Sequence, residues 1–205
     1  MKAGREELME LIDLWGYSED AQRKIAEVLA SEDPPPPHLF RYYGPKEGKG
    51  KVYQAEQLFA QTMGARYALA VNSGTSALMC AMAALEIGPG DEVIVPGYTF
   101  FASASIVVAS RAIPVIAEVN DSLNIDPVDV ERKITPQTRG IIVVHMKGMP
   151  ADMKEIMEIA DRHGLAVIED TAQACGASYQ GKMCGTIGDV GCYSFDFFKI
   201  AQCGE

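Results

Sequence analysis

Residues 152–170 read DMKEIMEIADRHGLAVIED, and this segment decides the fold. Its first part repeats apolar residues at helical spacing up to Gly164, which predicts an amphipathic helix over 152–163. Its second part is a continuous apolar run, which predicts a buried strand over 165–169. Because such a strand needs cover on both faces, the segment indicates a parallel sheet between two helical layers.

The same alternation extends over most of the chain. We expect helices at 53–63, 75–85, 102–109, shortly after Pro127 and at 152–163, and strands at 68–71, 92–95, 114–119, 140–144, 165–169 and 190–195. The predicted fold class is therefore α/β, a three-layer sandwich with a mostly parallel sheet.

The first 38 residues have a different character. Apolar side chains at helical spacing predict two short helices, the second capped by Ser18. These side chains are Leu8, Leu11, Ile12 and Trp15, then Ile25, Val28 and Leu29. Residues 34–37 are all proline, which we interpret as a stiff spacer, with a binding ligand as the alternative. We therefore divide the chain into a helical arm with a proline-rich linker, 1–38, and a large domain, 39–205.

Composition disfavours several classes of function. The 205 residues are 48% hydrophobic and carry a net charge of -10, which permits a substantial core and disfavours nucleic acid or anionic membrane as partners. A charged N-terminus and the lack of any long apolar window predict a cytoplasmic protein. Five cysteines without paired or zinc-type spacing predict reduced thiols and no metal site: Cys80, Cys175, Cys184, Cys192 and Cys203.

Near the C-terminus, residues 194–199 read SFDFFK and place a hydroxyl five positions ahead of a lysine. Phe197, Phe198 and Ile200 are apolar neighbours of Lys199. A lysine buried among them would favour the neutral amine that attacks a carbonyl carbon. The alternative is a surface lysine whose stem lies along apolar groups.

Asp170 follows the strand 165–169, at the edge of the sheet where open α/β folds bind their ligands. A carboxylate and a lysine suit pyridoxal phosphate, and Asp170 could pair with its ring nitrogen. Gln173 lies three residues further on and could hold the phenolic oxygen of the ring. The alternatives are an ordinary helix cap at Asp170 and a surface glutamine.

Pyridoxal phosphate also needs an anion cradle and a stacking surface. Gly74 permits close approach of backbone to phosphate at a helix start, and Thr75 and Ser76 add hydroxyls. Helix capping is the alternative for this segment. Phe100 follows the strand 92–95 and could stack on the cofactor ring, with core packing as the alternative.

Six motifs in order resemble the DegT/DnrJ/EryC1/StrS family of sugar aminotransferases. They are NSGTSAL (72–78), VP with TF (95–96, 99–100), VHMKG with ADM (144–148, 151–153), EDTAQA (169–174), GTIGD (185–189), and SF with a lysine (194–195, 199). The resemblance runs from about Phe40 to the end of the chain. It implies a fold-type-I enzyme that uses pyridoxal phosphate.

The resemblance also implies roles for individual residues. Lys199 would bind the cofactor as a Schiff base, Asp170 would pair with its pyridinium nitrogen, and Gln173 would approach its ring oxygen. Gly74, Thr75 and Ser194 would hold the phosphate.

Phe100 matches the position that stacks on the ring, whereas His145 has no catalytic role that we assign. The family commonly has threonine and asparagine where Phe198 and Ile200 flank the lysine, and the arm before Phe40 is not a recognised family feature. Family members continue about as far again into a small C-terminal domain, so we expect the large domain to be incomplete here. The family builds its active site across a dimer, which implies a homodimer.

The implied activity is transfer of an amino group from glutamate or glutamine to a nucleotide-linked keto-deoxysugar, in aminosugar biosynthesis. One alternative is a sugar 3-dehydratase, which carries histidine at the lysine position and is disfavoured by Lys199. The other is a catalytically silent fragment or binding module that keeps the fold.

Overall fold

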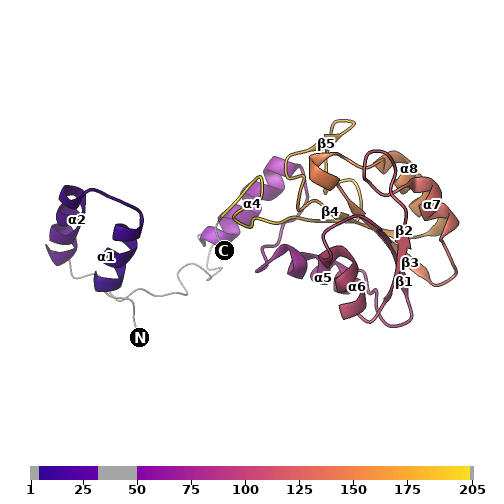
Figure 1. Cartoon of the computed structure of the whole chain (residues 1–205), viewed down its shortest axis with the longest axis horizontal. Helices are drawn as coiled ribbons and strands as arrows, with labels where there is room; N and C mark the ends of the chain where they lie inside the picture. Colours follow the sequence, from indigo (N-terminus) through magenta and orange to yellow (C-terminus); the bar gives the residue numbers. More distant parts are fainter. Residues whose placement is uncertain (1–4, 32–49, 204–205) are drawn as a thin grey trace. The chain divides into compact units, whose positions relative to one another are not determined.

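The computed structural model describes residues 5–31 and 50–203 (Figure 1). They fall into two compact units, Met1–Ala55 and Glu56–Glu205. The proline tract at 34–37 and the domain boundary expected after residue 38 both lie outside the described residues.

The first unit holds two short helices, α1 (Arg5–Leu14) and α2 (Glu19–Ser31). The Ser18 cap is confirmed, since its Oγ accepts the backbone N–H of Ala21 at 3.3 Å. Several apolar side chains of this unit are exposed, including Trp15 at 76% and Val28 at 60%. The helix α4 (Lys51–Met63) begins in this unit and ends in the second.

The second unit is built on a five-stranded sheet in which every neighbouring pair is parallel. The strand order is β2-β1-β3-β4-β7. The strands are β1 (Glu92–Pro96), β2 (Ile113–Ala117), β3 (Thr138–Val144), β4 (Ala166–Asp170) and β7 (Val190–Cys192). A small antiparallel hairpin, β5 (Ser178–Tyr179) and β6 (Lys182–Met183), lies between β4 and β7 in sequence.

Helices cover both faces of this sheet, as Figure 1 shows, and confirm the predicted three-layer α/β class. One face carries α5 (Gly74–Ala84) and α6 (Ala102–Ala109), and the other carries α7 (Pro127–Arg132) and α8 (Met153–His163). Ile141 and Ile142 are adjacent in β3 and fully buried, one in the core of each face. Burying each such side chain stabilises the fold by about 1.5–3 kcal/mol, which explains the continuous apolar runs.

The boundaries of these elements agree with the pattern at most positions. Helix α8 ends at Gly164, whose φ of 64° is the left-handed conformation that glycine adopts readily. The strand expected at 190–195 is shorter and ends at Cys192, and the strand expected at 114–119 ends at Ala117. Val119 instead forms an isolated bridge with Ile125.

The prediction of a strand at 68–71 is wrong for the structure described. These residues form no strand, and Leu69 is 77% exposed. A strand requires a neighbour that accepts and donates its backbone hydrogen bonds, and none of the described strands pairs with this segment. Among the helices of residues 5–31 and 50–203, none has both the length and the apolar character that crossing a membrane requires.

Candidate active site

Asp170 is the last residue of β4 and lies at the carboxyl edge of the sheet, with 6% of its surface exposed. Its Oδ2 accepts the hydroxyl of Ser103 at 2.8 Å, and its Oδ1 accepts the backbone N–H of Ala172 at 3.1 Å. Side chains alternate along a strand, so Asp170 shares a face with Ile168, which packs in the core under α5 and α6.

Burial raises the pKa of Asp170 above its ordinary value, although the hydrogen bonds from Ser103 and Ala172 oppose the effect. The nearby positive charge of Lys199 also opposes it. Asp170 is therefore a buried acid whose charged form is not fully compensated by its neighbours.

Sequence reasoning missed Ser103, which is fully buried on α6. Its hydroxyl also lies 3.1 Å from that of Thr99, which precedes it by four residues and lies before the start of α6. A hydroxyl four residues after another, just after a strand end, is the signal that could have identified it. The pattern cannot show that its partner lies 67 residues away on β4.

The start of α5 meets the segment that follows β7. A Cβ atom placed on Gly74 would lie 3.1 Å from the Cβ of Ser194 and 3.3 Å from the carbonyl oxygen of Tyr193. This contact is tighter than side chains normally make, so only glycine leaves space there. Two of the expected phosphate ligands, Gly74 and Ser194, are thereby brought together.

Capping of α5 falls to Ser73, a residue outside the expected set. Its Oγ accepts the N–H of Ser76 at 3.0 Å and donates to the hydroxyl of Ser76 at 3.0 Å. This segment therefore does cap a helix, through Ser73, the residue before Gly74. Thr75 lies on the first turn of α5 and is exposed. The N–H groups of Gly74 and Thr75 belong to the first turn, where backbone donors lack intrahelical partners.

Gln173 is half-buried, and its Oε1 accepts the backbone N–H of Lys147 at 3.1 Å. Lys147 holds a left-handed backbone with φ 51°, within a short 3-10 turn (Met146–Gly148) that follows β3. With the oxygen engaged, the amide NH2 is the end of Gln173 that can donate to a ligand. Sequence reasoning did not identify this contact from Lys147.

Phe100 is 58% exposed at the end of β1 and contacts Phe101, with ring centroids 4.6 Å apart. It is therefore not a core residue, which removes the packing alternative for this ring. Its carbonyl oxygen lies 3.4 Å from the hydroxyl of Ser103, which also contacts Asp170, so Ser103 lies between the Phe100 backbone and the Asp170 carboxyl.

Lys199 is half-buried, and its Nζ lies 4.6 Å from the centre of the Phe198 ring. The expected burial among apolar neighbours is wrong, since Phe197, Phe198 and Ile200 are 59%, 64% and 69% exposed. The reason is that this segment leaves the sheet after Cys192 and runs at the surface. Lys199 is nevertheless near enough to Asp170 for its charge to lower the pKa of that carboxyl.

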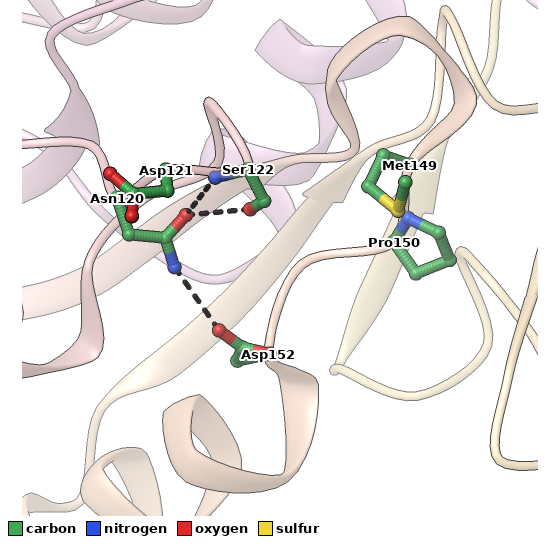
Figure 2. A pocket seen from close by; sticks show the side chains of 6 residues that line it. All are labelled: Asn120, Asp121, Ser122, Met149, Pro150 and Asp152. Atoms are coloured by element: carbon green, nitrogen blue, oxygen red, sulfur yellow. Dashed lines mark hydrogen bonds between the residues drawn. The ribbon is translucent and has the colours of Figure 1, made fainter.

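A separate cavity of about 480 Å³ lies between the loops after β2 and β3 (Figure 2). In it the Asn120 amide donates to Asp152 at 3.2 Å and accepts the N–H of Ser122 at 2.9 Å. Its lining consists of Asn120, Asp121, Ser122, Met149, Pro150 and Asp152, none of which was an expected site residue. Within the described ranges, no three His, Cys, Asp or Glu side chains are grouped as metal ligands would be.

Comparison with known proteins places this geometry in context. GDP-perosamine synthase of Caulobacter vibrioides is 46% identical over 156 residues, covering 75% of this chain and 42% of that protein. An aminotransferase structure from Psychrobacter cryohalolentis matches with TM-score 0.74 and 40% identity, over 91% of this chain and 45% of that one. A sugar aminotransferase of Streptococcus pneumoniae in its PLP form matches with TM-score 0.72 and 28% identity, over 74% and 43%.

The fold and its neighbours define the large domain of a fold-type-I aminotransferase. More particularly, the model of the DegT/DnrJ/EryC1/StrS aminotransferase family matches residues 46–205, and the chain belongs to this family. The chain spans less than half the length of the relatives just named.

Proposed function

We propose that the chain forms the cofactor-binding part of a pyridoxal phosphate-dependent aminotransferase that aminates a nucleotide-linked keto-deoxysugar. One observation carries the proposal: Asp170 is a buried acid at the carboxyl end of β4, oriented by Ser103 at 2.8 Å and within electrostatic reach of Lys199. The tight contact between Gly74 and Ser194 supports a phosphate cradle at the start of α5. The family implies the cofactor, and these residues fit it.

Asp170 would pair with the protonated ring nitrogen, and Ser103 would hold its carboxylate in position through the 2.8 Å hydrogen bond. A buried carboxylate gains most from a cation placed beside it, because water does not screen the pair. Gln173 would donate its amide NH2 to the ring oxygen, since its own oxygen is held by Lys147.

The phosphate would lie at the start of α5, against Gly74, Thr75, Ser76 and Ser194. Backbone N–H groups and the positive end of the helix dipole favour an anion at that place. Phe100 would cover one face of the ring, which its exposure permits.

When bound, the cofactor supplies an electron sink that stabilises negative charge on the substrate carbon. Lys199 would attach the cofactor through Nζ and, once released from it, would carry the proton between substrate and cofactor carbons.

The substrate class comes from relatives named for nucleotide sugars, such as GDP-perosamine synthase. We propose glutamate or glutamine as the amino donor, a homodimer as the assembly and the cytoplasm as the location. We also propose that residues 1–38 form an arm separate from the domain at 39–205.

The test is to add pyridoxal phosphate to the chain, reduce with borohydride and locate the modified lysine by mass spectrometry. We expect a visible absorbance band and modification at Lys199, both lost in Lys199→Ala. A folded chain that shows no band, or that is modified equally at surface lysines, would refute cofactor binding. Amino transfer from glutamate or glutamine to a nucleotide-linked keto sugar, followed by product mass, tests the activity of the complete enzyme.

A further inference from the structure

We propose that Glu169 is a positioning residue, whose buried carboxylate, oriented by His145, fixes the loop 185–188 and thereby the segment that carries Ser194 and Lys199. Glu169 lies on β4, His145 directly follows β3, and both are fully buried. The proposed function uses neither of them. The part of the inference that concerns the cofactor rests on that function.

The Glu169 carboxylate collects backbone donors from one loop. Its Oε1 accepts the N–H groups of Ile187 and Gly188, each at 2.7 Å, and its Oε2 accepts the N–H of Gly185 at 2.7 Å. His145 completes the set, with Nε2 at 2.9 Å from Oε2. A carboxylate offers acceptor sites for all four donors, whereas an amide would turn its own N–H groups toward some of them.

The hydrogen bonds fix the protonation of His145. The N–H of Ala151 donates to Nδ1 at 3.1 Å, so that nitrogen carries a lone pair. The ring proton therefore lies on Nε2 and is donated to Glu169. His145 thus connects the loop after β3 to the Glu169 carboxylate through its ring.

The charge state of Glu169 is consistent with this arrangement. Burial acts to raise its pKa and is the largest single influence, but the influence of His145 and the hydrogen bonds from Gly185 and Gly188 together outweigh it. The pKa of Glu169 is therefore lowered, and the carboxylate is ionised at neutral pH.

The loop that Glu169 holds leads directly into β7. Asp189 lies between the loop and β7. Its N–H donates to the carbonyl of Val167 at 2.9 Å, and its Oδ2 accepts the N–H of Val167 at 2.8 Å. Tyr193, just after β7, donates its hydroxyl to the carbonyl of Cys184 at 2.6 Å. The loop is therefore bound to β4, and the start of the lysine segment is bound to the residue that precedes the loop.

The pairing of β7 with β4 connects the loop 185–188 to the candidate site. β7 pairs with β4 so that Cys192 lies opposite Asp170, and Ser194 follows two residues later against Gly74. Adjacent residues of β4 point to opposite faces, so Glu169 fixes β7 from one face while Asp170 presents its carboxyl on the other. Glu169 can set the distance between Asp170 and Lys199 without touching the cofactor.

Amide hydrogen exchange, followed by NMR on the cofactor-free chain, tests the positioning directly. In Glu169→Gln we expect at least about tenfold faster exchange at residues 185–188 and at 190–199, because a buried donor left unpaired shifts a local opening equilibrium by roughly that factor. Strands β1 and β2 should keep their exchange rates. Faster exchange confined to 185–188, or equal acceleration throughout the sheet, would overturn the proposal.

Two variants of His145 separate positioning from general loss of structure. His145→Gln can donate to Glu169 and accept from Ala151, so its exchange pattern should match the wild type. His145→Leu can do neither and should reproduce the pattern of Glu169→Gln. Asp129→Asn is the matched control, since Asp129 is also buried and accepts a backbone N–H, from Glu118 at 2.8 Å, in another part of the domain. It should leave residues 190–199 unchanged.

Borohydride trapping with pyridoxal phosphate extends the test to the site. We expect the fraction of chain modified at Lys199 to fall about tenfold in Glu169→Gln and to be normal in His145→Gln and Asp129→Asn. Equal trapping in Glu169→Gln and wild type would overturn the role toward the lysine. If the wild type itself is not modified at Lys199, the proposed function fails, and the exchange experiment alone decides whether Glu169 positions the segment.

Discussion

Replacing Gly74 by alanine should separate folding from cofactor binding. The new methyl group would lie 3.1 Å from the Cβ of Ser194 and 3.3 Å from the carbonyl oxygen of Tyr193, so these atoms must move by a few tenths of an ångström. Such overpacking costs about 1–3 kcal/mol, and the loss of glycine's freedom in the unfolded chain offsets about 0.4–1 kcal/mol. We expect a net loss of roughly 1 kcal/mol in the free energy of unfolding.

The effect on pyridoxal phosphate should be larger. The methyl group would also lie 3.5 Å from the Oγ of Ser194 and would displace this proposed phosphate ligand. Loss of one hydrogen bond to a charged group weakens binding by about 1.5–3 kcal/mol, which is about 10- to 100-fold in the dissociation constant. Urea unfolding followed by circular dichroism measures the first quantity, and titration of the visible absorbance measures the second.

Two further variants separate the effect on stability from the effect on binding. Gly88→Ala is the control, because the nearest atom to its new methyl group would be the Ser110 carbonyl oxygen at 3.9 Å, and binding should be unchanged. In Gly74→Ala with Ser194→Gly, removal of the Ser194 Cβ should recover part of the stability but none of the binding. If Gly74→Ala binds pyridoxal phosphate as tightly as the wild type, the cradle is not at the start of α5.

Three other predictions concern the titratable groups. Because burial raises the pKa of Asp170 from 3.8, its ionisation above that pH destabilises the cofactor-free fold. At pH 7, Asp170→Asn should therefore have the same melting temperature as the wild type or a higher one. Its affinity for the cofactor should fall at least about tenfold. A lower melting temperature would contradict this. Glu169 acts in the opposite direction. Its lowered pKa stabilises the fold above pH 4.5, and this stability is lost as the pH falls through the folded-state pKa. The urea midpoints of wild type and Glu169→Gln should therefore converge at acid pH, and a difference that stays constant with pH would refute this. Burial is the main cause that raises the pKa of Cys184 to about 11 and of Cys192 to about 12, so iodoacetamide at pH 8 should label the exposed Cys80 at least about 100-fold faster than either, as read by peptide mass spectrometry; equal labelling would show that the core opens.

Much of the fold followed from residue pattern, because a strand covered on both faces must be apolar throughout. The strands near 140–144 and 165–169 were predicted within two residues for this reason. The segment 68–71 has a similar composition but forms no strand, since strand formation depends on a neighbour and not on the segment alone. Local pattern therefore identifies what can be a strand, and pairing decides what is one.

For the candidate site, sequence identified groups that project from element ends and missed groups that act through tertiary contact. Asp170 and Gly74 stand at such ends, and the structure gives both the expected surroundings. Ser103 and His145 are ordinary polar residues until their partners on β4 are known. The apolar setting expected for Lys199 was inferred from its immediate neighbours, but these residues lie in a turn, in which the N–H of Lys199 donates to the carbonyl of Asp196 at 2.9 Å, and neighbours along an exposed turn need not bury it.

Adjacent carboxyl groups on β4 illustrate how one strand can serve both folding and chemistry. Glu169 receives four donors and has a lowered pKa, whereas Asp170 receives two and has a raised one. The fold therefore satisfies the charge of Glu169 by itself, whereas under the proposed function the charge of Asp170 would be satisfied by the cofactor. Because successive residues face opposite sides, Glu169 can hold the loop before β7 from the face opposite to Asp170. A one-residue shift in register would exchange the two roles, so the pairing of β4 with its neighbours determines the site as much as the residues themselves do.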